Sequence, residues 1–153
     1  MFLVSSQAAY AADVDPASEF SVDNEAEIIQ IGELNNASII QLGDANFLSL
    51  QQQGSQNHFE STQVGTLNYI AANQQGSQNE ASLSQNGEFN EITLAQSGLG
   101  NFASIHQNGE SNYASVIQSG HANVANIEQY GYGNRVRVEQ SGNGNLATVV
   151  QGY

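Results

Sequence analysis

Hydrophobic and polar residues alternate in short segments that recur every eleven residues along this chain. Each segment has an Asn, two mostly apolar residues and a Gln at i, i+2, i+4 and i+6, which places all four side chains on one face of a β-strand. The first apolar position holds Ala37, Leu48, Phe59, Ile70, Ala81, Ile92, Ala103, Ala114, Ala125, Val136 and Ala147. The second holds Ile39, Leu50, Ser61, Ala72, Leu83, Leu94, Ile105, Val116, Ile127, Val138 and Val149. The pattern predicts twelve strand-like segments between Asn24 and Gln151.

Three residue types fix the register of this repeat. Gln recurs at Gln30, Gln41, Gln52, Gln63, Gln74, Gln85, Gln96, Gln107, Gln118, Gln129, Gln140 and Gln151. Gly follows two positions later at Gly32, Gly43, Gly54, Gly65, Gly76, Gly87, Gly98, Gly109, Gly120, Gly131 and Gly142. Asn occupies Asn24, Asn35, Asn46, Asn57, Asn68, Asn79, Asn90, Asn101, Asn112, Asn123, Asn134 and Asn145. Such self-similarity is typical of a repeat protein in which each unit packs on its neighbours.

A helical repeat must be considered, because eleven residues is also the period of a right-handed helical supercoil. A Gly in every unit and regular Asn and Ser oppose a helix, since these residues are poor helix formers. The strict alternation between each Asn and the next Gln also has the period of a strand. The sequence therefore predicts an all-β fold, with no helix in the repeat region.

The repeat predicts a two-sheet β-solenoid of the cross-β, amyloid type. We expect strands of about six or seven residues, separated by Q-x-G-x-x-N bends in which Gly supplies backbone angles that a Cβ would forbid. Two strands and two bends make one coil of 22 residues, so the twelve segments give about six coils. Coils would stack about 4.8 Å apart through parallel, in-register pairing.

One large residue tests whether the two predicted sheets share a close-packed core. Phe59 is the only aromatic residue at either apolar position, and its neighbours Ser61 and Ala72 are both small. Two small residues beside one large ring are what a densely packed interior requires.

The inward Gln and Asn residues are the candidate site residues, as amide ladders. Burying an amide without a partner costs about 1–3 kcal/mol, so these side chains need partners in the core. Stacked in register, each amide can bond to the identical amide one coil away, as in cross-β structures. The end coils cannot complete these ladders, and we expect their backbone edges to stay open, which favours end-to-end polymerisation.

The composition excludes several classes of protein. The chain has 15 acidic residues against 2 basic ones, a net charge of −13 and no Cys. Phosphate binding needs clustered basic residues, so nucleic acid is not an expected ligand. No disulfide or thiolate metal site can form without Cys. No apolar run approaches the roughly 18 residues of a membrane-spanning helix.

No constellation for catalysis, metal binding or a cofactor is visible, so we expect the protein not to be an enzyme. His58 and His106 fall on outward positions of different coils, whereas His121 lies in a bend, so they should not meet at one metal. Outward Glu residues such as Glu80 and Glu91 are expected to be solvated charges that discourage lateral sheet stacking.

The segment before the repeats indicates export. Residues 1–11 combine an apolar stretch with Ala9-Tyr10-Ala11, a small-x-small pattern typical of secretory cleavage sites, and we interpret them as the remnant of a signal peptide. Residues 12–23 form an acidic leader or targeting segment, and residues 24–153 form the solenoid.

The repeat resembles that of the curlin family. The motif Q-x-G-x-x-N-x-A-x-x-x-Q is complete in the segment Gln96-Ser97-Gly98-Leu99-Gly100-Asn101-Phe102-Ala103-Ser104-Ile105-His106-Gln107, and it occurs again from Gln107, Gln118 and Gln140. The resemblance implies a subunit of curli, the extracellular amyloid fibres of Gram-negative biofilms. It further implies a second curlin subunit as partner, an outer-membrane secretion pore with accessory chaperones, and association with the outer-membrane surface.

The family has a major subunit that builds the fibre and a minor one that nucleates it. Asn at every strand start, uniform spacing and a short acidic leader make this chain look closer to the minor type, although minor subunits often end in basic repeats and here only Arg135 and Arg137 are basic. A non-polymerising β-solenoid adhesin or binding protein is the alternative. Adhesion could use the outward aromatic residues Phe47, Tyr69, Phe102, Tyr113 and Tyr132.

Overall fold

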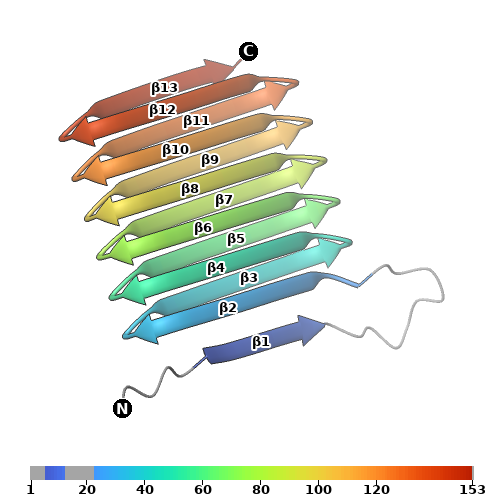
Figure 1. Cartoon of the computed structure of the whole chain (residues 1–153). Helices are drawn as coiled ribbons and strands as arrows, with labels where there is room; N and C mark the ends of the chain where they lie inside the picture. Colours follow the sequence, from blue (N-terminus) through green and yellow to red (C-terminus); the bar gives the residue numbers. More distant parts are fainter. Residues whose placement is uncertain (1–5, 13–22, 153) are drawn as a thin grey trace.

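The computed structural model of the chain describes residues 6–12 and 23–152, and the acidic leader lies almost entirely outside them. The described residues form strands joined by tight bends, and no helix occurs among them, as the sequence predicts (Figure 1). The strands are β1 (Ser6–Ala12), β2 (Glu25–Glu33), β3 (Asn36–Asp44), β4 (Phe47–Ser55), β5 (His58–Thr66), β6 (Tyr69–Ser77), β7 (Glu80–Glu88), β8 (Glu91–Leu99), β9 (Phe102–Glu110), β10 (Tyr113–His121), β11 (Val124–Tyr132), β12 (Arg135–Asn143) and β13 (Leu146–Gly152).

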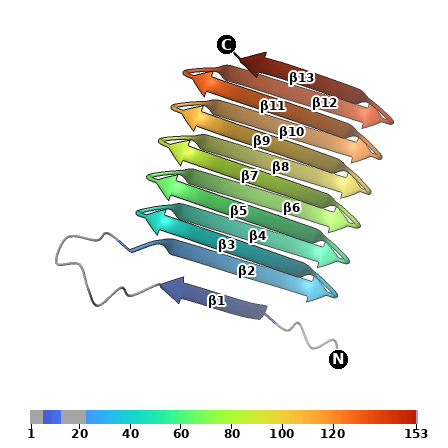
Figure 2. The same cartoon turned by 180° about the vertical axis from the view of Figure 1, so that it is seen from behind.

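Successive strands alternate between two sheets that face each other. Sheet A has the order β1-β2-β4-β6-β8-β10-β12, and sheet B has the order β13-β11-β9-β7-β5-β3. Each even-numbered strand and the next odd-numbered strand make one coil, and the six coils stack from β2 to β13 (Figures 1 and 2). The predicted two-sheet β-solenoid is therefore confirmed.

All strands from β2 to β13 pair in parallel and in register. In sheet A, Gln74 of β6 faces Gln96 of β8 and Gly76 faces Gly98. In sheet B, Gln85 of β7 faces Gln107 of β9 in the same way. Every paired residue thus lies beside the residue 22 positions further along, and the repeated Gln and Gly form columns of identical residues that run along the solenoid axis.

The core is the thin layer between the two sheets. Its members are the apolar residues predicted from the alternation, and the inner coils bury them almost completely, with Leu48, Phe59, Ile70 and Ile92 at 0% exposure. Ala72 belongs to the same buried cluster as Phe59, and Ser61 is buried as well, in agreement with the predicted packing. The Ser61 Oγ is the one buried side-chain polar atom in the described part of the chain that has no hydrogen-bond partner.

The strands are longer than the sequence predicts. Each of β2 to β12 has nine residues, whereas six or seven were expected. The difference arises because strand pairing continues past the Gln and through the Gly, where we expected the bend to begin. Gly98, for example, has φ of 117° and still pairs with its counterparts in neighbouring coils, so only two residues remain outside the strands at each bend.

This pairing leaves no room for a side chain at the repeated Gly. A Cβ added to Gly98 would overlap the backbone carbonyl of Gly120 in the next coil. Gly100, two residues later in the same bend, has φ of 65° and open space around it. Equivalent positions in other bends hold Gln78 and Phe89 at φ of 57° and 55°. The repeated Gly is therefore required by close approach of backbone, and Gly100 is not.

The N-terminal edge of sheet A differs from the expectation of two open ends. Strand β1 pairs with β2 in an antiparallel register that runs from Ser6 opposite Ile31 to Ala12 opposite Glu25. It therefore covers the edge of the first even-numbered strand, whereas β3 remains the edge strand of sheet B. At the C-terminal end, β12 and β13 are the outermost strands of their sheets.

The two Gly positions of one bend predict losses of stability that differ in size. Gly98→Ala should destabilise the solenoid by about 3 kcal/mol or more, because it adds a clash to an unfavourable φ. Gly100→Ala should cost about 1 kcal/mol, the ordinary penalty for a left-handed residue. Urea unfolding of freshly diluted, unpolymerised protein measures both values. Similar losses for the two variants would contradict the close-approach explanation.

Ser61 predicts a stabilising substitution. Ser61→Ala removes a buried hydroxyl that lacks a partner, and it should raise the free energy of unfolding by about 1 kcal/mol. Ser82→Ala is the matched control, since Ser82 is an exposed residue of the neighbouring strand β7 and should change stability by less than about 0.5 kcal/mol. The same unfolding measurement applies, and a loss of stability in Ser61→Ala would show that the hydroxyl is paired.

Candidate functional site

The inward Gln residues form two continuous ladders, one in each sheet. Except in Gln140 and Gln151, which end the ladders, the Nε2 atom of each Gln donates to the Oε1 atom of the Gln one coil closer to the C-terminus; in Gln52 and Gln74 these atoms are 2.7 Å apart. The sheet A ladder comprises Gln30, Gln52, Gln74, Gln96, Gln118 and Gln140. The sheet B ladder comprises Gln41, Gln63, Gln85, Gln107, Gln129 and Gln151.

Each inward Gln amide from Gln41 to Gln151 also bonds to the facing sheet. In sheet A, Nε2 of Gln74 donates to the backbone carbonyl of His58, the first residue of β5 in sheet B, at 3.0 Å. In sheet B, Nε2 of Gln85 donates to the carbonyl of Tyr69 in sheet A at 3.1 Å. The second Nε2 hydrogen thus satisfies a strand-end carbonyl and ties the two sheets together.

The Asn residues form two further ladders at the bends. The Asn68 Nδ2 atom donates to Oδ1 of Asn46 at 3.0 Å, and the Asn68 backbone N–H donates to the same oxygen at 3.1 Å. The Asn68 Nδ2 atom also donates to the carbonyl of Gly87 in the next coil at 2.8 Å. One Asn side chain therefore links three successive bends and supplies partners for their main chain.

The two kinds of ladder point in opposite directions. In the bonds between identical side chains, Gln amides donate toward the C-terminal end, whereas Asn amides donate toward the N-terminal end. The Asn backbone N–H groups donate to the same Asn oxygens, and only the second Nδ2 hydrogen of Asn points to the Gly carbonyl of the next coil. Within residues 23–152, Gln140 and Gln151 donate only to backbone, and the Oδ1 atoms of Asn134 and Asn145 accept nothing. The C-terminal end thus offers amide donors at Gln and amide acceptors at Asn.

The N-terminal end offers the complementary groups. Within residues 23–152, the Oε1 atom of Gln41 accepts no hydrogen bond. The backbone N–H of Asn35 likewise donates to no Asn side chain there, whereas the N–H of Asn57 donates to Oδ1 of Asn35. Burial follows the same division between centre and ends. Gln and Asn are fully buried in the inner coils, but Gln41, Gln151 and Asn35 are half-buried and Asn145 is exposed.

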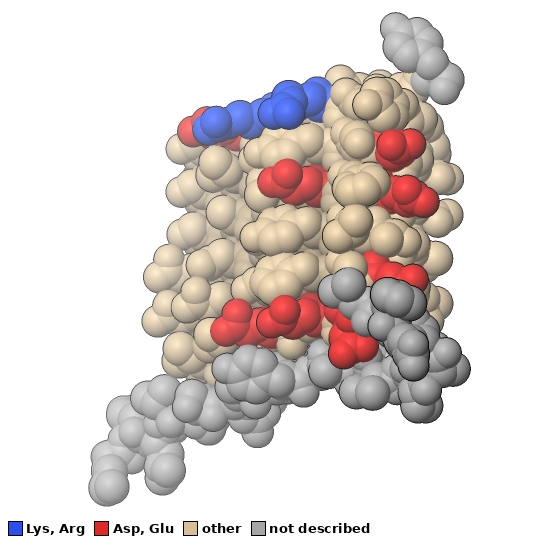
Figure 3. Space-filling view, turned by 90° about the vertical axis from the view of Figure 1, so that its right-hand side faces the viewer, with Lys and Arg blue, Asp and Glu red and all other residues tan. Residues whose placement is uncertain are grey.

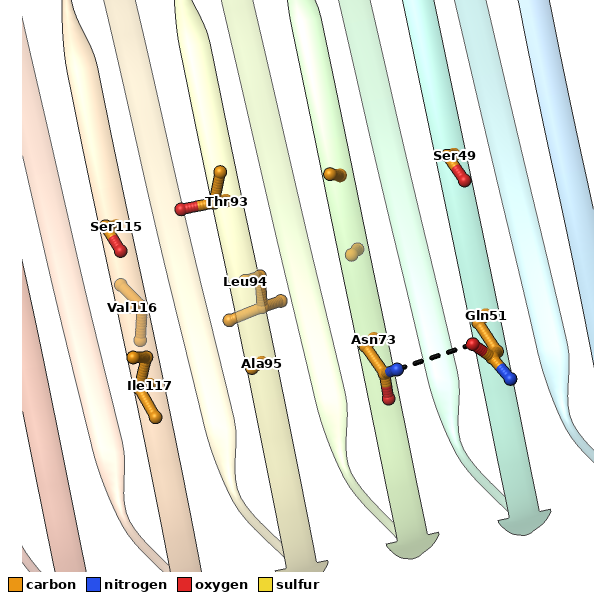
Figure 4. Close-up of a pocket in the computed structure, with 11 residues that line it drawn as sticks. Ser49, Gln51, Asn73, Thr93, Leu94, Ala95, Ser115, Val116 and Ile117 are labelled. Carbon is orange, nitrogen blue, oxygen red and sulfur yellow. Dashed lines mark hydrogen bonds between the residues drawn. The ribbon is translucent and has the colours of Figure 1, made fainter.

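The outer face of sheet A carries a shallow groove of about 380 Å³ (Figure 4). Most of its lining residues are small or uncharged outward residues of β4, β6, β8 and β10, such as Ser49, Ala71, Thr93 and Ser115. Asn73 donates to Gln51 across two of these strands at 3.5 Å. The lining contains no carboxylate, imidazole or other group that titrates near neutral pH, so it offers hydrogen bonds but no acid or base.

Aromatic residues occur on the outward surface, as the sequence predicts. Phe47 and Tyr69 stack with ring centroids 5.3 Å apart, and Tyr132, the last residue of β11, is 75% exposed. The Tyr130 hydroxyl donates to Glu128 at 3.0 Å, and this hydrogen bond raises the pKa of Tyr130. Phe47 and Tyr69 lie on sheet A and the two Tyr residues of β11 on sheet B, whereas the Gln and Asn ladders lie between the sheets.

The charged side chains do not form a metal-binding cluster in the described part of the chain. No group of three or more His, Asp or Glu residues there is close enough to share a metal ion. His58 and His106 lie on the outward side of β5 and β9, and His121 ends β10. Nor does any helix in residues 6–12 and 23–152 have the length and hydrophobicity to span a membrane.

The two basic residues lie together at one end. Arg135 and Arg137 both belong to β12, and Figure 3 shows the basic side chains at the C-terminal end of the stack, with acidic side chains spread below them. Arg137 forms an exposed ion pair with Glu139 at 3.2 Å, and the Arg135 guanidinium lies 4.7 Å from the centre of the Tyr113 ring.

Some partners of the candidate residues cannot be read from the repeat. The sequence identifies the amides that stack, but not the strand-end carbonyls that the Gln residues reach or the Gly carbonyls that the Asn residues reach. The 22-residue register helps only once one such bond is known, because the same bond then recurs in the other coils. Asn46 and Asn68, for example, each donate to the Gly carbonyl 19 residues later in the sequence.

Comparison of the sequence with models of known protein families gives a match to one family. The sequence profile of the curlin associated repeat matches residues 23–57, 87–120 and 120–152, roughly two thirds of the chain. Residues 58–86, between the first two matches, pair in the same parallel register as the rest of the solenoid. They include Phe59 and Ser61, the aromatic residue and the polar residue at the repeated apolar positions. A comparison with curated proteins gives no match.

Proposed function

This chain belongs to the curlin repeat family, and from that membership we propose that it is a structural subunit of extracellular curli amyloid fibres. The fibre would grow by end-to-end stacking of solenoids, so that the sheets of one copy continue into those of the next. Membership in the family implies self-association into fibres; the stacking geometry and the role in biofilm matrix and adhesion are our proposals.

One observation carries this proposal, namely the complementarity of the two solenoid ends. The C-terminal end presents Gln donors and Asn acceptors, while the N-terminal end presents Gln acceptors and Asn donors. A second copy stacked in the same orientation would therefore extend all four ladders without change of geometry. Exposed strand edges of this kind also pair readily with further strands.

The N-terminal segment fits export before assembly. We propose that residues 1–11 are the tail of a secretory signal and are removed after Ala11, which would take away all of β1 except Ala12. Residues 12–23 would then be an acidic leader for targeting. The partners proposed at this stage are the curli secretion pore of the outer membrane and its accessory chaperones.

We also propose that the protein nucleates fibres at the bacterial surface, together with a second curlin subunit, as the minor type does. The uniform Asn at the strand starts supports this, because each coil end then has the same donors and acceptors for a partner strand. A nucleator must present a pre-organised strand edge to its partner subunit, and it need not build a long fibre itself. Association with the outer membrane would hold that edge at the cell surface.

Fibre formation by the purified chain tests the function. We expect a lag followed by a rise in the fluorescence of an amyloid dye, a lag that shortens with protein concentration, and fibres with a diffraction repeat of about 4.8 Å. Small amounts should also shorten the lag of a partner curlin. A chain that stays monomeric at all concentrations while binding surfaces would instead indicate the non-polymerising adhesin.

The position of an amide in the stack predicts its effect on growth. Replacing Gln140 and Asn145 by Ala removes groups that would bond to the next copy, so it should lengthen the lag more than replacing Gln85 and Asn90. The central pair should cost more stability, because neighbouring buried amides lose partners worth about 1–3 kcal/mol each. Lag at matched monomer concentration and urea unfolding separate the two effects, and equal lags would refute templating by the edge.

A further inference from the structure

The register of the coils determines which residues would meet between two copies. Inside the molecule every column pairs a residue with the one 22 positions later, as Gln118 pairs with Gln140 and Gly120 with Gly142. If β2 of a second copy continues sheet A beyond β12 with the same columns, Gln140 meets Gln30 and Gly142 meets Gly32. The rest of the contact then follows from the sequence.

In this register the charged residues of the two ends are complementary. Arg135 of one copy meets Glu25 of the next, and Arg137 meets Glu27. All four side chains lie on the outward side of sheet A, where β12 ends the sheet and β2 begins the repeat. Arg135 and Arg137 are the only Lys or Arg residues in the chain, and both occupy β12, the outermost strand of sheet A. Opposite charges directly across neighbouring strands attract, and like charges repel.

The columns between these ends are nearly free of charge. Between Glu27 and Arg137, the middle outward column of sheet A holds only the uncharged residues Ser49, Ala71, Thr93 and Ser115. The column between Glu25 and Arg135 contains Phe47, Tyr69, Glu91 and Tyr113, with one carboxylate among aromatic residues. Charge in these columns is therefore concentrated at the two ends, with opposite sign (Figure 3).

Sheet B adds apolar contacts in the same register. When β3 of the second copy continues the sheet beyond β13, Val150 meets Ile40. These two side chains are 65% and 51% exposed in the single chain. The half-buried core residues Val149 and Ile39 also meet, which would complete the core across the junction. Strand β3 is an edge strand, so sheet B can accept the second copy without displacing β1.

We propose that Arg135 and Arg137 of one copy pair with Glu25 and Glu27 of the next, and that these pairs fix the direction and register of stacking. The partner is a second copy of this chain, and the inference rests on the proposed function as a fibre subunit. Arg135 would lie between the Tyr113 ring and Glu25, and Arg137 between Glu139 and Glu27. The strand β1 occupies the same edge of β2, so it must leave before sheet A can join.

Charge reversal at each end tests the pairing. Arg135→Glu with Arg137→Glu, and separately Glu25→Arg with Glu27→Arg, should each slow seeded elongation about tenfold, since two attractive pairs become two repulsive ones. An equimolar mixture of the two variants should grow at close to the wild-type rate. In the mixture each reversed end meets a complementary end of the other variant, so the fibre would alternate between them.

Two controls separate charge at the junction from other effects. Glu60→Arg with Glu80→Arg changes the net charge as much as the Glu25 and Glu27 variant does, but on exposed residues of β5 and β7, and it should not slow growth. Circular dichroism and unfolding midpoints of the unpolymerised variants establish that they fold. If a charge-reversed variant does not fold, the neutral variant Arg135→Gln with Arg137→Gln is used instead. Elongation of this neutral variant should depend much less on salt concentration than elongation of the wild type.

The outcomes distinguish this inference from the function on which it rests. Wild-type fibres together with a mixture that grows no faster than its components would overturn the Arg–Glu pairing and leave the fibre function intact. Elongation of both reversed variants at the wild-type rate would also overturn the Arg–Glu pairing and leave the fibre function intact. Failure of the wild-type chain to form fibres would overturn the proposed function and the pairing with it.

Discussion

Hydrogen bonding of buried side-chain amides is the constraint on which the whole structure depends. In the inner coils, Gln and Asn lie in the layer between two sheets, where water cannot reach them, and each would leave an unpaired buried group if no identical residue lay one coil away. Only parallel, in-register stacking provides that neighbour at every level. The 22-residue coil, the Gly columns and the straight axis of the stack all follow from this requirement.

The sequence predicts the fold in detail because the repeat overdetermines it. The alternation of Asn, two apolar residues and Gln assigns each side chain to a face, and the constant spacing assigns each strand to a neighbour. Even the local exception at Phe59 could be anticipated from the small residues Ser61 and Ala72 around it. The positions of the candidate amides are equally predictable, since a repeat of fixed length allows only one set of columns.

Features that break the repeat, or depend on direction, could not be predicted. The extra strand residues come from Gly at φ near 117°, a backbone angle that allows both pairing and bending and that sequence alone does not reveal at Gly98. The covering of β2 by β1 involves residues outside the repeat. The direction of each ladder depends on rotamers that place Nε2 of Gln toward one end and Nδ2 of Asn toward the other.

The opposite directions of the two kinds of ladder have an electrostatic consequence for a long assembly. A row of amides bonded head to tail adds its dipoles along the axis, as peptide groups do in a helix, and the terminal partial charges would then act on every added subunit. Here two Gln rows point one way and two Asn rows point the other. Their dipoles oppose each other, and strand dipoles contribute little, so the axial macrodipole should not grow with the number of coils.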